Sequence, residues 1–328
     1  MNMVGKRAIC FCAVTALALL AGCDRHDKAE HYYLIATNVG LPYWQTANDG
    51  LQKAAEQYGV TAEMDGPSTF DPQAEAQAFR AAAAKKPAGI LVSVADANLM
   101  TPEIDSAVSS GIPVITIDSD APQSHRLYFI GTNNLQAGRI GGERVARQLN
   151  GRGNVVFFSM PGQPNLDERL KGYEDAFSKY PAINIVEIFD MKGNSGSAMD
   201  KAEEYLARTG KNKVDGLVCL EASAGKDVAE AIRRSNVTGR TLVAMDVDPA
   251  TLNLVKEGVI DSTLSQKPFT MALYGLKALD DVHHYPVKNM AVNYSFDPFA
   301  PFPAFVDTGV SLVDKTNVEN VLSHTKGK

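Results

Sequence analysis

The sequence predicts an α/β fold with two similar doubly wound parallel-sheet lobes joined by a multi-strand hinge, and three observations lead to this prediction. An apolar run rich in β-branched residues follows Gly111 and ends on Asp118, which is typical of a buried parallel strand. The same pattern recurs 128 residues later, between Gly239 and Asp246. The rest of the chain alternates apolar strands with amphipathic helices, as doubly wound domains do.

Each copy of the repeat contains a second strand that also ends on a polar side chain. These strands end at Ser93 in the first copy and at Glu221 in the second, and each end lies 25 residues before the aspartate of its copy. Open α/β sheets bind ligands at the carboxyl ends of their strands. If the two lobes face each other, we therefore expect the four polar strand ends to point into one cleft.

The first half of the chain supplies the elements of one lobe in alternation. Its first helix starts near Pro42, which suits a first helical turn, and carries Ala47, Leu51 and Tyr58 on one apolar face. The strands are short apolar runs between such helices. We expect strands over residues 32–38, 60–65, 90–93, 111–118 and 127–131 and further helices over residues 72–85 and 102–110.

The second half repeats this alternation. A helix over residues 135–149 starts the crossing into the second lobe, and an amphipathic helix over residues 269–282 follows the last strand of its series. Between these two helices lie the remaining expected elements. They are strands over residues 154–159, 183–190, 217–220, 242–245 and 262–266 and helices over residues 167–180, 198–208 and 224–233.

The end of the chain is expected to return to both lobes. Strands near Val292 and over residues 305–313 would each close one lobe, so that several crossings form a hinge. The expected N-terminal lobe comprises residues 32–131 and 268–295, and the expected C-terminal lobe comprises residues 132–267 and 296–328.

Length and composition describe an ordinary soluble globular protein. The chain has 328 residues, of which 45% are hydrophobic, and its mean hydropathy is -0.14, so it is long enough for two domains with sizeable cores. The formal net charge is -6, and removing the two positive charges of Lys6 and Arg7 makes it -8. A negative charge argues against nucleic acid as a partner.

The first residues have the features of an export signal. Lys6 and Arg7 form a basic region, residues 8–20 form an apolar stretch too short to span a bilayer comfortably, and Leu20 to Gly22 resemble a small-residue cleavage site. We therefore expect a signal peptide over residues 1–22 and an exported protein.

The cleavage site is followed directly by Cys23, and the sequence Leu-Ala-Gly-Cys resembles the lipobox of bacterial lipoproteins. This resemblance implies that Cys23 is acylated, becomes the mature N-terminus and anchors the protein to the membrane on its extracytoplasmic, or periplasmic, side. More than one acyl chain is expected, because a single chain holds a protein only marginally. Residues 23–31 would then form a short tether.

The remaining reactive residues favour structural roles. Cys219 is the one cysteine outside the leader and the lipobox, and its apolar strand indicates a small buried hydrophobe without a disulfide. The glycine-rich segment Gly138–Gly142 lies in an expected helix and lacks the context of a dinucleotide loop. His283 and His284 at a helix end favour a solvated face over a metal site. We expect no cofactor, no metal and no catalytic residue.

Several motifs together resemble the type I periplasmic binding proteins, in particular the ribose-like sugar-binding components of ABC transporters. The resemblance covers nearly the whole mature chain. The segments that carry it are Leu41-Pro-Tyr-Trp44, Gly111-Ile-Pro-Val-Ile-Thr-Ile-Asp118, Glu168-Arg169 before Gly172-Tyr173, Ala244-Met-Asp246 and Ser265-Gln266-Lys-Pro268.

The resemblance assigns roles to particular residues. Tyr43 and Trp44 would stack on a sugar ring, whose C–H bonds suit the face of an aromatic system. Asp118 and Asp246 would accept hydrogen bonds from sugar hydroxyl groups, and Arg169 and other donors would complete the site. The expected ligand-binding residues are Thr37, Tyr43, Trp44, Ser93, Asp118, Ser119, Arg169, Asn194, Glu221, Asp246 and Gln266.

The chain also departs from the ribose-binding pattern. Ser119 stands where ribose binders have an arginine, Glu221 where they have an asparagine, and Leu41 where they have another asparagine. Asn194 aligns with the aromatic residue that closes the other side of the ring. These departures argue against ribose, and the excess of acceptors favours a neutral polyhydroxylated or cationic ligand over an acidic sugar.

The resemblance therefore implies a monomeric lipoprotein that captures a sugar or polyol and delivers it to an ABC permease. One alternative is a receptor that presents its closed form to a chemotaxis or sensor-kinase partner. Another is a sugar-active enzyme that uses Asp118 and Asp246 as acid and base. A ligand-responsive repressor is a further alternative, but the leader and the absence of a helix-turn-helix motif before His31 count against it.

Overall fold

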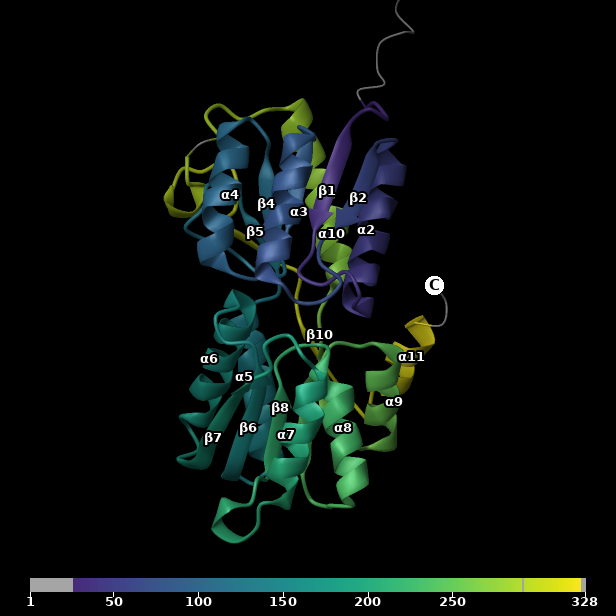
Figure 1. Ribbon diagram of the computed structural model, residues 1–328, viewed down its shortest axis with the longest axis vertical. Helices are drawn as coiled ribbons and strands as arrows, with labels where there is room; N and C mark the ends of the chain where they lie inside the picture. The colour runs from purple at the N-terminus through teal and green to yellow at the C-terminus, as the bar shows by residue number, and fades with distance from the viewer. Residues whose placement is uncertain (1–25, 291, 326–328) are drawn as a thin grey trace, which may run out of the picture.

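The structure, a computed structural model, shows two lobes stacked along the long axis of the molecule (Figure 1). It describes residues 26–290 and 292–325, so the expected signal peptide and Cys23 lie outside the described residues. Each lobe contains one six-stranded sheet with helices on its faces. Within the described part of the chain, no helix is both long and apolar enough to cross a membrane.

The sheet of the first lobe is parallel throughout and has the strand order β11-β5-β4-β3-β1-β2. Hydrophobic clusters lie on both of its faces, one under helices α2 and α10 and the other under α3 and α4. The elements are β1 (His31–Ile35), α2 (Pro42–Tyr58), β2 (Thr61–Asp65), α3 (Pro72–Ala84), β3 (Gly89–Val92), α4 (Ala97–Ser109), β4 (Val114–Ile117), β5 (Phe129–Gly131), α10 (Pro268–His284) and β11 (Phe305–Asp307).

The sheet of the second lobe has the order β12-β10-β9-β8-β6-β7, in which only β12 runs antiparallel to its neighbour among the described strands. Its elements are α5 (Asn134–Gln148), β6 (Arg152–Ser159), α6 (Pro164–Phe177), β7 (Ala182–Asp190), α7 (Gly196–Ala207), β8 (Gly216–Cys219), α8 (Ala224–Ser235), β9 (Thr241–Met245), α9 (Pro249–Glu257), β10 (Ser262–Ser265), β12 (Ser311–Asp314) and α11 (Val318–Thr325).

The two sheets confirm the predicted fold class. Strands β3 and β4 of the first copy hold the same places in their sheet as β8 and β9 of the second copy hold in theirs. The 128-residue repeat therefore corresponds to a duplicated arrangement of strands. The carboxyl ends of these four strands lie at the edges of the sheets that meet between the lobes (Figure 1).

Three segments cross between the lobes, after β5, after β10 and after β11. The third crossing corrects the expected boundary after residue 295, because β11 pairs with β5 and so belongs to the first lobe. The chain leaves that lobe between Asp307 and Ser311. The expected single strand over residues 305–313 is therefore two strands in different lobes.

The expected strand near Val292 was also wrong. That region forms turns and a short 3-10 helix at Tyr294–Phe296, and Val292 packs partly buried against the core of the first lobe. Pro298, Pro301 and Pro303 follow closely. Proline cannot donate to a strand ladder, so apolar residues here cover the core without pairing.

Helix starts differ from the prediction where a capping side chain was overlooked. Helix α4 begins five residues before Pro102, because Asp96 accepts hydrogen bonds from the backbone N–H groups of Asn98 and Leu99, at 2.8 and 3.3 Å. Helix α9 was not predicted, although Asp248 caps it in the same way. Helix α11 was also missed.

Helices α5 and α6 approach each other so closely that only glycine fits at their contact. A Cβ atom at Gly138 would lie 1.9 Å from the backbone oxygen of Arg169, and one at Gly172 would lie 2.2 Å from the backbone oxygen of Leu135. The glycine-rich segment in α5 therefore serves helix packing. The contact also fixes the backbone from which the Arg169 side chain extends.

We expect Gly138→Ala to lower the free energy of unfolding by about 1 to 3 kcal/mol, the usual cost of overpacking, because the two helices must separate to admit the methyl group. Urea denaturation measures the change. The control is Gln136→Ala, an exposed position on the same helix, which should change stability by less than about 0.5 kcal/mol. Equal stability of the two variants would contradict the close contact.

Candidate ligand-binding site

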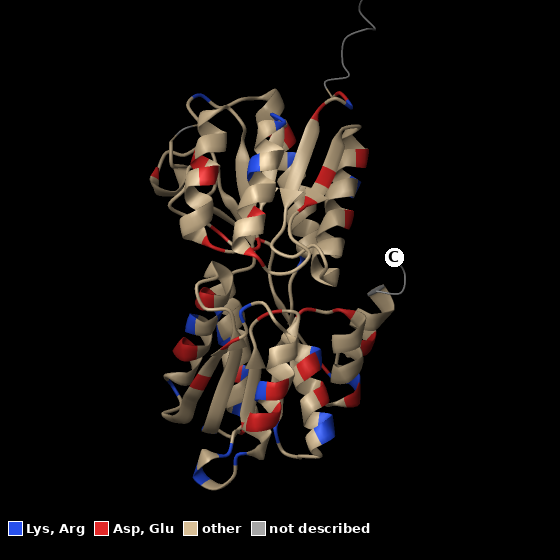
Figure 2. Cartoon of the chain, viewed as in Figure 1, with Lys and Arg blue, Asp and Glu red and all other residues tan. Residues whose placement is uncertain are grey.

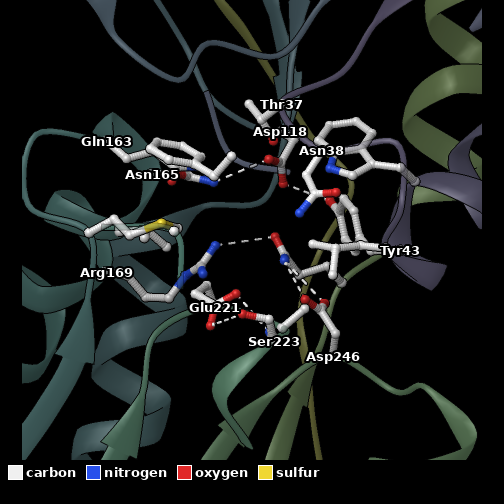
Figure 3. Close-up of a pocket in the computed structure, with 18 residues that line it drawn as sticks. Thr37, Asn38, Tyr43, Asp118, Gln163, Asn165, Arg169, Glu221, Ser223 and Asp246 are labelled. Carbon is white, nitrogen blue, oxygen red and sulfur yellow. Dashed lines mark hydrogen bonds between the residues drawn. The ribbon is translucent and has the colours of Figure 1, made fainter. Parts of the chain in front are cut away.

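The strand ends of both lobes face a cleft at the junction (Figure 3). The empty space in it, including the part open to solvent, is about 550 Å³. Acidic residues are spread over both lobes and also lie at this junction (Figure 2). The structure brings eight of the expected residues to the wall of the cleft: Thr37, Tyr43, Trp44, Asp118, Arg169, Glu221, Asp246 and Gln266.

Asp118 and Asp246 share an uncommon backbone conformation directly after their strands. Their φ angles are 63° and 67°, in the left-handed region that few residues other than glycine adopt. Both side chains are buried. Backbone strain of this kind gathers at functional sites, and its recurrence 128 residues apart marks the two aspartates as equivalent parts of one site.

Asp118 accepts hydrogen bonds from three side chains. The Tyr43 hydroxyl donates to Oδ1 at 2.6 Å, and the Ser93 hydroxyl and the Asn165 amide donate to Oδ2 at 3.3 and 3.2 Å. Burial raises the pKa of Asp118, whereas the Tyr43 hydrogen bond and the charge of Arg169 act to lower it. Ser93 therefore supports Asp118 from behind and does not line the cleft.

Asp246 has fewer donors than its counterpart. The Gln266 amide donates to its Oδ1 at 3.1 Å. Burial raises the pKa of Asp246 to about 7, and the Arg169 charge and the Gln266 hydrogen bond only partly oppose this effect. The carboxyl group thus lines the cleft with spare acceptor capacity.

Part of the hydrogen-bonding capacity of Glu221 is used at the start of the helix that follows it. It accepts hydrogen bonds from the backbone N–H groups of Ser223 and Ala224, at 2.7 and 2.8 Å, and from the Ser223 hydroxyl at 2.8 Å. A carboxylate at a helix N-terminus is also favoured by the helix dipole. Burial raises its pKa. Glu221 therefore binds the backbone N–H groups at the N-terminus of α8, and the rest of its side chain lines the cleft.

Arg169 is the buried cation between these carboxylates, with 1% of its surface exposed. Its guanidinium donates to the backbone oxygen of Leu220 and to Asn134 Oδ1, the latter at 2.7 Å, and more weakly to Gln266 Oε1 at 3.4 Å. Burial raises the pKa of Asp118, Glu221 and Asp246, and the charge of Arg169 acts against this rise in all three. One cation thus partly offsets the burial of acidic groups from both lobes.

The apolar part of the wall comes mainly from the first lobe. The rings of Tyr43 and Trp44 meet edge to face at 5.1 Å between centroids, and Trp44 lines the cleft while 2% of its surface is exposed. Phe70 lies in the loop before α3 and packs over Gly193 of the second lobe. Sequence reasoning missed Phe70, since no motif surrounds it.

Besides Ser93, two further expected residues lie away from the cleft wall. Ser119 is fully buried, and its hydroxyl has no hydrogen-bond partner among the described residues. Asn194 is exposed and accepts a hydrogen bond from the backbone N–H of Gly196 at the start of α7. Its neighbour Gly193 lines the cleft instead.

The start of α6 adds polar groups that sequence reasoning missed. Gln163 and Asn165 line the cleft, and Gln163 Oε1 and Asn165 Oδ1 are buried without a hydrogen-bond partner in the described residues. Buried acceptors of this kind are costly unless a ligand or water satisfies them. Pro164 between them was a signal, because proline favours the first position of a helix.

Comparison with known proteins agrees with the two-lobed fold. A family model described as "Periplasmic binding protein domain" matches residues 32–283. A xylose/arabinose-binding protein of Sulfolobus acidocaldarius is 22% identical over 298 residues, which cover 86% of this chain and 70% of that protein. A sugar-binding protein of a sugar ABC transporter from Bacillus halodurans has a solved structure with 33% identity and a TM-score of 0.77, covering 89% of this chain and 99% of that one. An arabinose-binding protein from Geobacillus stearothermophilus has 32% identity and a TM-score of 0.72, covering 89% and 98%.

We expect Asp246→Asn to stabilise the protein more at pH 8 than at pH 5. The carboxyl group titrates near pH 4 when unfolded and near 7 when folded, so the folded state holds its proton longer. The wild type therefore loses stability as pH rises between these values, by up to about 1.4 kcal/mol per pH unit. The asparagine side chain of the variant cannot ionise, so the variant does not lose this stability as the pH rises.

Urea denaturation at both pH values measures the difference. The control is Asp49→Asn on the exposed side of α2, which should change stability by less than about 0.5 kcal/mol. A stability gain for Asp246→Asn that does not depend on pH would show that Asp246 titrates normally in the folded protein.

Proposed function

Since the chain belongs to the periplasmic binding protein family, we propose that it is an extracytoplasmic sugar-binding component of an ABC transporter. It would capture a sugar or polyol in the cleft between its lobes and deliver it to a permease. Arabinose and xylose are the first ligands to test, because two of the similar proteins are a xylose/arabinose-binding protein and an arabinose-binding protein. Proteins of this family bind ligands, and we propose binding without catalysis for this chain.

The observation that carries the proposal is a pair of buried aspartates that face one cleft and share a left-handed backbone conformation. Asp118 and Asp246 offer carboxylate oxygens to hydroxyl donors, and hydrogen bonds to charged groups contribute about 1.5 to 3 kcal/mol each. The amide oxygens of Gln163 and Asn165, which have no hydrogen-bond partner in the described part of the chain, add further acceptors. A neutral molecule with many hydroxyl groups can satisfy these acceptors without bringing its own charge.

The aromatic wall supplies the other half of sugar recognition. Trp44 and Tyr43 present apolar ring surface beside the acceptors, and the C–H bonds of a sugar ring suit such surfaces. Because the Tyr43 hydroxyl donates to Asp118, Tyr43 would also hold that carboxylate in place. The Trp44 ring is then the main candidate for stacking.

Binding in this cleft would favour closure of the lobes. Asp118 in the first lobe and Asn165 in the second are hydrogen-bonded to each other across the cleft, and the wall has members from both lobes. A ligand that touches both lobes binds the closed form more tightly than the open form, and this difference shifts the population. The closed form would be the one that the permease receives.

The proposal includes a lipid anchor at Cys23. The Leu-Ala-Gly-Cys match supports it, and so does the short distance along the chain, since only seven residues separate Cys23 from the first strand at His31. A tether of this length would keep the first lobe close to the membrane surface.

Calorimetric titration with pentoses, hexoses and polyols should identify at least one saturable ligand. Asp118→Ala should weaken its binding by about 2 to 4 kcal/mol, on the order of 30-fold to 1000-fold in affinity, because charge-assisted hydrogen bonds are lost and water replaces them only partly. The matched control is Asp49→Ala at an exposed site. Unchanged affinity in Asp118→Ala would remove this residue from the site, and failure of every sugar and polyol would refute the function.

Fractionation of producing cells tests the anchor. The wild type should partition with membranes, whereas Cys23→Ser should remain soluble with unchanged sugar affinity, because acyl chains require the thiol. Cys219→Ser serves as the control, since Cys219 is buried in the second lobe. An unmodified Cys23 in the mass spectrum of the native protein would exclude lipidation.

A further inference from the structure

Four side chains with metal-binding groups meet at the end of the first lobe that is opposite the cleft. They are His26, Glu30, Asp280 and His284, and one ligand atom from each lies within 4.8 Å of the others. Helix α10 runs from the junction between the lobes to this end, where β1 begins (Figure 1). We propose that these four residues bind a divalent transition-metal ion, with Zn²⁺ as the first candidate.

The distances between ligand atoms within the cluster suit an ion with tetrahedral coordination. Bonds of about 2.0 to 2.1 Å to a tetrahedral zinc place neighbouring ligand atoms about 3.4 Å apart. Asp280 Oδ1 lies 3.3 Å from His26 Nδ1 and 3.7 Å from His284 Nε2, and Glu30 Oε2 lies 3.2 Å from His284 Nε2. Three separations thus require little adjustment to admit an ion at the centre.

The chemistry of the donors selects the class of metal. Two imidazole nitrogens with two carboxylate oxygens form a mixed set that suits zinc and similar ions, whereas calcium and magnesium prefer oxygen alone. Glu30 and Asp280 supply two negative charges when ionised, which balance a divalent cation.

Two features hold the donors in position. Asp280 is 2% exposed, and the Tyr32 hydroxyl donates to its Oδ1 at 3.2 Å, the kind of outer contact that orients metal ligands. His284 follows Asp280 by one helical turn on α10 and therefore shares its face. His26 Nδ1 is buried and makes no hydrogen bond among the described residues; its ion-pair neighbour at 3.3 Å is Asp280 Oδ1, the atom with which it would share the ion.

The structure separates two histidines that the sequence treated as one solvated pair. His283 is exposed, as expected, but the ring of His284 turns into the cluster and meets His26 edge to face at 4.8 Å. Glu30 and His26 lie in the segment that was expected to be only a tether. An ion would hold this segment against α10, whether or not the cleft binds sugar.

The test is titration of the protein, purified as the cell produces it and treated with chelator, with Zn²⁺ alone. We expect one equivalent to bind and the melting temperature to rise, because a ligand that binds only the folded state stabilises it. His26→Ala and His284→Ala should each weaken binding by at least about 100-fold, since outer contacts alone are worth 10- to 100-fold. Co²⁺ should give the visible absorption of a tetrahedral site.

His283→Ala is the matched control, because it removes a neighbouring exposed histidine, and it should bind Zn²⁺ like the wild type. Circular dichroism and titration of the cleft with sugar check that each variant is folded. Absence of saturable Zn²⁺ binding would overturn the proposal. So would binding that survives both His26→Ala and His284→Ala, which would place the ion elsewhere, or a loss of stability in these variants that is the same with and without Zn²⁺.

Discussion

The burial of Arg169 is the constraint on which the site depends. A guanidinium removed from water costs several kcal/mol unless charges and hydrogen bonds compensate it. The contact between α5 and α6, possible only because of Gly138 and Gly172, fixes the backbone that carries this side chain. Burial raises the pKa of three carboxyl groups from both lobes, and the charge of Arg169 acts against that rise in each of them. Tight packing inside one lobe therefore places a charge that influences carboxyl groups in both.

The two lobes have equivalent strand arrangements, but the binding site between them is not symmetrical. Asp118 and Asp246 occupy equivalent places with the same left-handed backbone, but their surroundings differ. Asp118 receives hydrogen bonds from three side chains, whereas Asp246 receives its hydrogen bonds from Gln266 alone among the described residues. A sugar has different groups along its two sides, so equivalent backbones with different neighbours can distinguish its orientation. Three crossings connect the two halves of this site, and the closure proposed above would bring them together.

Helix α10 runs from the cleft at one end of the first lobe to the His26–Glu30–Asp280–His284 cluster at the other end. It starts at Pro268, beside the cleft residue Gln266, and ends at His284 in the cluster near the N-terminal segment. The cleft end is shared between lobes, whereas the cluster involves only the first lobe and the residues before β1. Closure of the lobes therefore need not disturb the cluster, and the segment near the proposed anchor can stay fixed while the second lobe moves.

The sequence by itself determined the α/β class, the repeat and the strand-end carboxylates, because strand periodicity and motif spacing are local properties and parallel strands end at one edge of a sheet. It also identified the aromatic residues at the start of α2. Only the tertiary structure assigned β11 to the first lobe, since strand pairing depends on a partner far away in the chain. Only the tertiary structure also shows the packing of Phe70 over Gly193, the hydrogen bond from Asn165 to Asp118 and the ring contact between His26 and His284. These contacts join residues from distant segments, and no local pattern specifies such distances.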